Sequence, residues 1–351
     1  MEQHELSTNE APEINESLCL NCQARPYVEG HSTKLCAECR VKLINFPIPK
    51  WIWIFTGIIV LMMLWGMVRM PLYLGTALHL GRAEKAMNQK HYVTALHELE
   101  KVIAHFPQNT ECLTRIVICN ARNMEFDKMS VALSALEGKK IEDKDLYNEV
   151  QNTINKMSLY YETDTLLARR INDAFDSAQA LLAIYSEIAN DKSDAANLGA
   201  VMIASNLYDL NNYSEAEKII NAVLANNASC YPALTLQIAV KRNLRKFDEA
   251  VALCDKMLEE NKENVNAICQ RARVELKRGN DAVAARYATQ AMQLVPENTV
   301  VLETKALVEY LAGHKEESML LFKKIKTLET PGDTVISTRL AVILSGQEKY
   351  R

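Results

Sequence analysis

A set of small residues recurs every 34 positions along the chain, and this period limits the folds that are open to it. Two such series lie twelve positions apart: Ala204, Ile238, Ala272 and Ala306, followed by Ala216, Ala250, Ala284 and Ser318. A unit of this length predicts two antiparallel helices that cross closely where the small side chains meet. One pair cannot bury its apolar face alone, so neighbouring pairs stack. The period predicts an all-α solenoid, an architecture that works by binding rather than by chemistry.

The period also predicts where each helical pair begins. Ala250 and Ala284 are expected where the two helices of a pair touch. A bulky side chain at either position should therefore lower the free energy of unfolding by about 1–3 kcal/mol. In this frame the units start near Thr76, Thr110, Asn197, Tyr231, Val265 and Thr299, with a partial unit from Asp333. A helical bundle with accidental periodicity is the alternative, and four consecutive units in phase argue against it.

The stretch around residues 140–196 is less regular. It is expected to hold an extra helix near Lys144–Tyr161 and one helical pair near Thr163–Ala196. In that pair Arg170 and Leu182 stand where the other units have small residues. This part of the chain therefore departs from the repeat that surrounds it.

The small residues, together with Pro107 and Pro296 at the ends of second helices, resemble the tetratricopeptide repeat family over residues 76–351. The resemblance implies about six to seven repeats, with the first helix of each repeat lining a concave groove. Carried onto this chain, it implies groove residues in four units: Tyr208, Arg242, Arg273, Lys277 and Tyr310.

A basic groove flanked by tyrosines suits an extended protein segment with acidic and apolar residues. The family's pattern for clamping a chaperone carboxylate is not matched, because Val201 and Ser205 stand where it needs Lys and Asn. If Arg242 and Arg273 are surface residues, replacing either by alanine should change the free energy of unfolding by less than about 0.5 kcal/mol. The alternative is that these side chains are only solvated.

Composition and motifs argue against catalysis and against nucleic acid as the main partner. Glycine is scarce, at 11 of 351 residues, which disfavours loops that cradle phosphates. The net charge of −4 gives no bulk attraction to nucleic acid. The sequence contains no HExxH, GxSxG, GKS, GKT or GxGxxG motif. We therefore expect a protein that is not an enzyme and has no small-molecule substrate.

Four of the nine cysteines are clustered near the start of the chain. Residues 1–16 carry five glutamates and no lysine or arginine, and are predicted to be a disordered acidic tail. Residues 17–45 then contain two CxxC pairs, formed by Cys19, Cys22, Cys36 and Cys39. Two such pairs complete the tetrahedral site that zinc prefers, with no open position for catalysis. This segment resembles a compact zinc ribbon that holds structural Zn²⁺.

The partner of this zinc module is less defined. Residues 17–50 carry five basic and two acidic side chains, a weak electrostatic footprint for nucleic acid, and Tyr27 alone is available for stacking. Small zinc modules also dock proteins. We favour a protein contact, with nucleic acid as the unlikely alternative.

The other five cysteines do not suggest disulfides, because their number is odd and they fall at helical positions. We expect them to act as small apolar side chains. They are Cys112, Cys119, Cys230, Cys254 and Cys269.

An apolar run follows the cysteine cluster. Trp51–Val68 contains eighteen residues without a charge and would extend about 27 Å as a helix, close to the hydrocarbon thickness of about 30 Å. Tryptophans lie near both ends, and Lys50 and Arg69 flank the run. The sequence predicts a single transmembrane helix at 51–70. The segment is not a cleavable signal peptide, because fifty residues precede it.

The orientation in the membrane depends on the zinc chemistry. Basic residues are nearly balanced on the two sides of the span. Clustered thiolates hold zinc most safely in a reducing compartment. We therefore expect the N-terminus in the cytoplasm and the repeats on the extracytoplasmic or periplasmic side, although five unpaired cysteines there argue mildly against it.

Together these features predict a non-enzymatic scaffold or adaptor in the cell membrane that binds protein through its repeats. Two alternatives remain open. One is a membrane-tethered regulator whose zinc module contacts nucleic acid, and the other is an accessory subunit of a membrane enzyme or a secretion complex.

Overall fold

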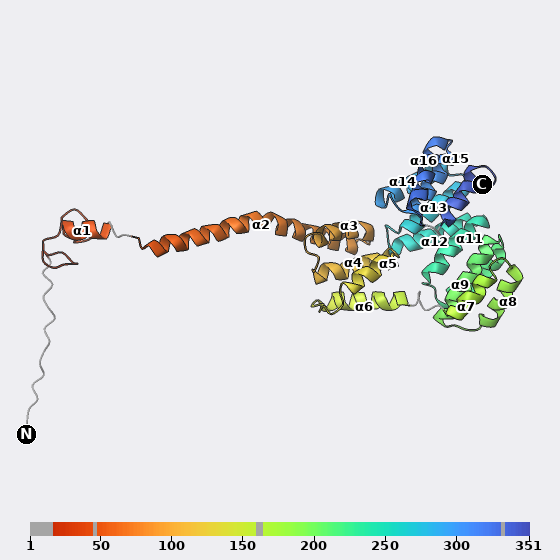
Figure 1. The fold of residues 1–351 in the computed structure, drawn as a ribbon, viewed down its shortest axis with the longest axis horizontal. Helices are drawn as coiled ribbons and strands as arrows, with labels where there is room; N and C mark the ends of the chain where they lie inside the picture. Colours follow the sequence, from red (N-terminus) through yellow and green to blue (C-terminus); the bar gives the residue numbers. More distant parts are fainter. Residues whose placement is uncertain (1–16, 45–47, 159–163, 331–333) are drawn as a thin grey trace, which may run out of the picture. The chain divides into compact units, whose positions relative to one another are not determined.

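The computed structural model describes residues 17–44, 48–158, 164–330 and 334–351 (Figure 1). The expected acidic tail, residues 1–16, lies outside them. The chain divides into two compact units, residues 1–73 and 74–351. Within the described residues the secondary structure is helical apart from one isolated bridge between Leu18 and Pro26.

The first unit contains one short helix and most of one long helix. The short helix, α1, spans Ala37–Ile44, and the long helix, α2, spans Lys50–Asn88. The apolar run at 51–70 and the repeat expected to start near Thr76 are not separate helices, because α2 continues through both and contains Pro71. Its most apolar window has a mean hydropathy of 2.1, and none of that window is buried.

The second unit is built from helical pairs. The first helices of these pairs are the end of α2, α4 (Thr110–Arg122), α7 (Thr165–Asp173), α9 (Asp194–Asp209), α11 (Tyr231–Asn243), α13 (Val265–Arg278), α15 (Thr299–Leu311) and α17 (Val335–Leu344). The second helices are α3 (Tyr92–Ile103), α5 (Phe126–Ser134), α8 (Ala178–Ile188), α10 (Tyr213–Asn226), α12 (Phe247–Glu260), α14 (Asp281–Leu294) and α16 (Lys315–Leu328). Helix α6 (Lys144–Ser158) packs against α4. The fold is therefore an all-α solenoid of the tetratricopeptide type, as predicted.

The turn within each regular pair has one backbone geometry, which repeats every 34 residues on each side of the irregular stretch. Its central residue is left-handed, with φ between 57° and 96°, at Lys90, Met124, Asn211, Arg245, Gly279 and Gly313. In each turn the next residue donates its N–H to a carbonyl five positions back, as Lys246 does to Lys241. This bond satisfies a carbonyl that the helix end would leave free. The turn then starts the second helix immediately.

The small residues lie at the helix crossings, as expected. Ala250, Ala272 and Ala284 have no exposed surface. The exception in the series, Ser318, is also buried, and its hydroxyl donates to the carbonyl oxygen of Ala306 at 2.8 Å. This hydrogen bond explains how a polar side chain is tolerated at a crossing, because both of its partners lie away from water.

We expect Ala284→Leu to destabilise the solenoid by about 1–3 kcal/mol, because the α13–α14 crossing has no room for the added atoms. Ala282→Leu is the matched control, since Ala282 is exposed on the same helix and should change stability by less than about 0.5 kcal/mol. Urea unfolding followed by far-UV circular dichroism measures both. Equal midpoints for the two variants would show that the crossing is not tightly packed.

The irregular stretch is held by contacts of its own. Helices α7 and α8 are joined by the Arg170–Glu187 ion pair, with an N···O distance of 2.8 Å, and Arg170 stands where the first helix of a regular pair has a small residue. Gly199 of α9 faces Leu167 of α7, and a Cβ on Gly199 would lie 2.6 Å from the Leu167 side chain. A glycine at this point lets the two helices approach closely.

Two stretches that are far apart in the sequence are joined by hydrogen bonds, of which one is exposed and the others are partly buried. Glu263, in the turn between α12 and α13, accepts the backbone N–H of Thr94 at 2.8 Å and its hydroxyl at 2.6 Å. Asn261 donates to the carbonyl oxygen of Arg122 at 2.9 Å, and Lys90 donates to the carbonyl oxygen of Glu259. We call this group of contacts the brace.

Removing the Glu263 carboxylate, which accepts the Thr94 hydrogen bonds of the brace, should lower the stability of the fold. We expect Glu263→Ala to lower stability by about 1–3 kcal/mol, because it leaves the Thr94 N–H without its acceptor. Glu259→Ala is the control, since its side chain is exposed and its bonded carbonyl belongs to the backbone. Hydrogen exchange of the Thr94 amide should accelerate in the first variant alone. Unchanged exchange would mean that the brace does not form in solution.

Candidate functional site

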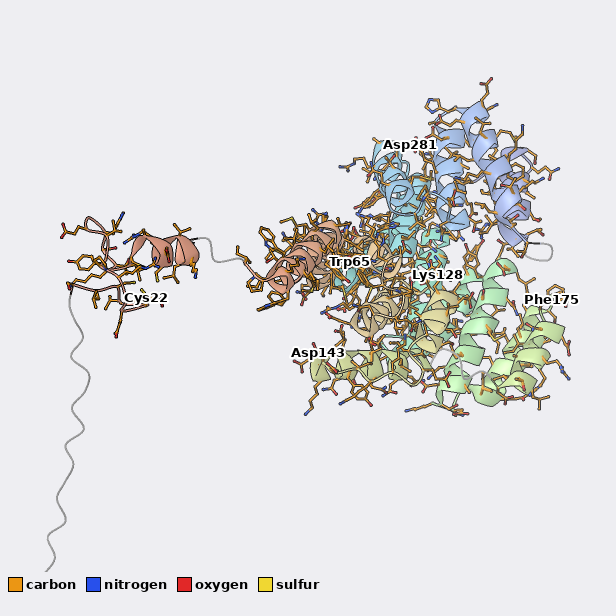
Figure 2. All side chains as sticks on the ribbon, turned by 60° about the vertical axis from the view of Figure 1, so that its left-hand side comes forward. Cys22, Trp65, Lys128, Asp143, Phe175 and Asp281 are labelled. Carbon is orange, nitrogen blue, oxygen red and sulfur yellow. The ribbon has the colours of Figure 1, made fainter. Side chains whose placement is uncertain are left out.

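The four clustered cysteines are brought together by a loop and the start of a helix. Helix α1 begins directly after Cys36 and carries Cys39 in its first turn. The other pair lies in a tight turn in which Gln23, with φ of 50°, donates its N–H to the carbonyl oxygen of Cys19. Figure 2 shows Cys22 in the loop beside α1.

The geometry of the four thiols fits one tetrahedral ion. All four Sγ atoms lie within 4.8 Å of one another, and those of Cys22 and Cys36 are 3.7 Å apart. Zn–S bonds of about 2.3 Å place the corners of a tetrahedron about 3.8 Å apart. Three of the thiols are buried, Cys22 is exposed, and all four are free of disulfides. The cluster can therefore hold a metal ion.

The surroundings of the cluster favour the thiolate at Cys19 but not at Cys39. Burial opposes ionisation of Cys19, but hydrogen bonds from the backbone amides of Cys36, Cys22 and Asn21 outweigh it and lower its pKa to about 6. The side-chain amide of Asn21 also donates to Cys39 Sγ at 3.4 Å. Donors of this kind orient and stabilise metal-bound thiolates. The hydrogen bond from Asn21 lowers the pKa of Cys39, but the hydrogen bond with Cys36 and burial outweigh it and raise that pKa to about 11.

The five remaining cysteines are buried and unpaired, as expected. Burial raises the pKa of Cys112 and of Cys254 to about 12. These thiols stay protonated and unreactive near neutral pH.

A polar cavity of about 280 Å³ opens where the first helices of five consecutive pairs meet. Each of these helices contributes two residues to its lining: Tyr208 and Asp209 of α9, Arg242 and Asn243 of α11, Arg273 and Lys277 of α13, Glu303 and Leu307 of α15, and Arg339 and Ile343 of α17. Four of the five predicted groove residues therefore line one cavity. The fifth, Tyr310, packs against the apolar core instead.

Arg273 is buried rather than solvated, and the expectation that it behaves as a surface residue is wrong. Only 7% of it is exposed, and it donates to Glu303 at 2.6 Å and to the Thr304 hydroxyl at 2.9 Å. Burial alone would raise the pKa of Glu303, but Arg273 and Arg339 outweigh it and hold that pKa below its ordinary value. The neighbouring α15 helix supplies the partners that bury this arginine.

Arg242 is equally buried, so the expectation that it behaves as a surface residue is wrong too, but it is differently paired. It donates to the side-chain oxygen of Gln270 at 2.5 Å and to the Tyr208 hydroxyl at 3.2 Å, both of which are neutral. Its Nε atom is buried without a hydrogen-bond partner. Burial and then repulsion from Arg242 lower the pKa of Lys277. The cavity thus has a cationic side with unused hydrogen-bonding capacity.

Sequence reasoning missed part of the cavity. Glu348 and Tyr350, which follow α17, also line it. They follow the one helix of the partial last unit, where the second helix of a full repeat would begin, so the 34-residue period does not predict their position. Arg339 lies in the partial last unit and was not singled out either.

Comparisons with known proteins show a likeness of architecture. No protein-family model matches the sequence. No curated protein matches it either. A tetratricopeptide repeat protein from Parabacteroides merdae is 13% identical and aligns over 78% of this chain and 99% of its own, with a TM-score of 0.40.

Solved structures of MamA show a similar likeness. MamA from Desulfovibrio magneticus is 15% identical over 49% of this chain and 93% of its own, with a TM-score of 0.37. MamA AMB-1 is 19% identical over 46% of this chain and 94% of its own, with a TM-score of 0.34.

Proposed function

We propose that this protein is a membrane-anchored, non-enzymatic scaffold that binds protein partners through the polar cavity of its solenoid. The observation that carries the proposal is Arg242, a buried cation in that cavity with neutral partners and an unsatisfied Nε. A buried polar group without a partner is costly. A ligand that supplies an acceptor would remove that cost, and an extended segment of another protein has both length and acceptors to do so.

The zinc module would serve as a second docking element. Cys19, Cys22, Cys36 and Cys39 would hold a structural Zn²⁺ in a zinc ribbon-like module, since four thiolates leave no position for water or substrate. Support comes from the spacing of their sulfur atoms. The weak positive charge of the module favours contact with protein over nucleic acid.

Helix α2 would anchor the chain. It is long and apolar enough to cross a membrane by length and composition. The guanidinium of Arg69 lies over the Trp65 ring at 5.1 Å, an arrangement suited to the polar edge of a bilayer. We propose an N-terminus in the cytoplasm and a solenoid outside it, because a zinc–thiolate site is safest in a reducing compartment.

Labelling in intact cells tests this topology. A membrane-impermeant maleimide should modify Ser130→Cys, an exposed position on α5, and should reach Ser7→Cys only after the membrane is permeabilised. The solenoid's own thiols are buried, which keeps the background low. The reverse pattern would place the solenoid in the cytoplasm.

Co-purification after gentle detergent extraction tests the function itself. A stable, stoichiometric protein partner is the expected result. Co-purifying nucleic acid without such a partner would contradict the scaffold proposal and favour a regulator instead.

A further inference from the structure

The segment after α17 folds back onto the polar cavity. Gly346, with φ of 78°, ends the helix, and Glu348 donates its N–H to the carbonyl oxygen of Val342. A left-handed glycine in this position reverses the chain direction after a helix. Residues 346–351 therefore return toward the helices that line the cavity, and Glu348 and Tyr350 become part of its wall.

Tyr350 is held by three kinds of contact. Lys277 Nζ lies 4.9 Å from the centre of its ring, within the range of a cation–π interaction. Its hydroxyl is 3.5 Å from the carbonyl oxygen of Arg273, and its ring packs against the core beside Leu307. An aromatic side chain thus fills one end of the cavity.

The charges around Tyr350 are not balanced. Arg273 and Arg339 share Glu303. Within the described residues, Arg242 and Lys277 form no ion pair with a carboxylate. Asp209 also lines the cavity, and burial raises its pKa, which opposes its ionisation. Glu348 is the acidic residue of the returning segment, whose two basic residues are Lys349 and Arg351, and it acts electrostatically on Lys277. The cavity is therefore complementary to an acidic residue next to an aromatic one.

We propose that this cavity is a peptide site for a segment that carries a carboxylate two positions before a tyrosine, and that Glu348 and Tyr350 occupy it as a built-in competitor. The proposal rests on the scaffold function above and names the chemistry of its partner. A segment tethered by a few residues competes at an effective concentration of about millimolar. A partner must displace it, so the affinity of the intact chain is lower than that of the open site.

The probe is a fluorescein-labelled peptide with the sequence of residues 345–351, titrated by anisotropy against the full chain in detergent. We expect it to bind a variant that lacks residues 346–351 at least about tenfold more tightly than the parent, because the tethered copy is gone. A probe with alanine in place of Tyr350 should bind that variant about tenfold more weakly. Equal binding to parent and variant, or no binding to either, would overturn the proposal.

Two neighbouring positions on α13 supply the matched controls. In the variant that lacks residues 346–351, Lys277→Gln should weaken probe binding about tenfold. Arg278→Gln should leave it unchanged, since Arg278 pairs with the exposed Asp248 outside the cavity lining. Equal losses for both changes would show that the probe responds only to general positive charge, which contradicts a specific site.

The two proposals can fail separately. If a stoichiometric protein partner is recovered but binds the Lys277→Gln variant as well as the parent, the scaffold function stands and this cavity is not its site. If the probe binds as expected and no protein partner is recovered, the peptide site stands and the scaffold function falls.

Discussion

Replacing Cys36 by serine should remove zinc from the protein and unfold the module around α1. The module is small, and among its described residues, 17–44, the one cluster of buried apolar residues is built from Cys19, Cys36 and Cys39 with Leu35 beside them. Metal ligation therefore supplies most of its folding free energy, about 10–16 kcal/mol for comparable zinc-finger peptides near neutral pH. Elemental analysis of the purified chain should show about one zinc in the parent and none in the variant.

Hydrogen exchange and a second cysteine complete this test. Amides of residues 17–44 should lose protection in Cys36→Ser. Cys254→Ser, a change in the solenoid core, should keep its zinc, since Cys254 is far along the chain from the cluster and buried among apolar side chains. A reduced, metal-replete parent without zinc would refute the metal site.

The second large effect is expected at the buried ion pair of the cavity. Arg273→Ala should destabilise the solenoid by up to about 3–5 kcal/mol, because the Glu303 carboxylate, 1% exposed, loses its buried partner and keeps only the half-exposed Arg339. Arg278→Ala removes an arginine from the same helix whose partner, Asp248, is 87% exposed. Such a surface pair contributes about 0–1 kcal/mol. Urea unfolding measures the free energy of unfolding of both variants. Equal losses would show that Arg273 is no more important to the fold than a surface arginine.

The same pair gives a pH dependence of known sign. The pKa of Glu303 is lowered in the folded state. Its contribution to stability is therefore complete above its unfolded pKa of about 4.3 and disappears as the pH falls through the lower folded value. In Glu303→Gln, the free energy of unfolding should fall less steeply than in the parent as the pH is lowered. An identical acid profile in parent and variant would mean that the carboxylate is not charged in the fold.

The helical pairs could be predicted because their signal is local and repeated. Small residues at crossings recur with the period, so the predicted starts at Thr110, Tyr231, Val265 and Thr299 coincide with the first residues of α4, α11, α13 and α15. The turns are harder to recognise in the sequence, because their left-handed position is not always a glycine. Gly279 adopts this conformation at no steric cost, but Arg245 and Asn211 adopt it at the equivalent positions of other turns.

The environment of the cavity residues was harder to predict. A helical position can place Arg273 toward the cavity, but its burial depends on Glu303 and Thr304, which another helix supplies. The brace has no periodic signature, because Thr94 and Glu263 belong to different units and are 169 positions apart. The four clustered cysteines could be named from the sequence, since paired CxxC motifs already define most of the geometry of a candidate metal site.

The brace has a consequence for how the protein is made. Ribosomes add about 5–20 residues per second, so Thr94 emerges roughly 10–30 seconds before Glu263 is synthesised. During that interval the first helical pairs exist without the turn that later covers them, and contacts between such distant residues form slowly. The order of synthesis therefore makes closure of the brace a late step, and truncated or stalled chains would display an unfinished surface.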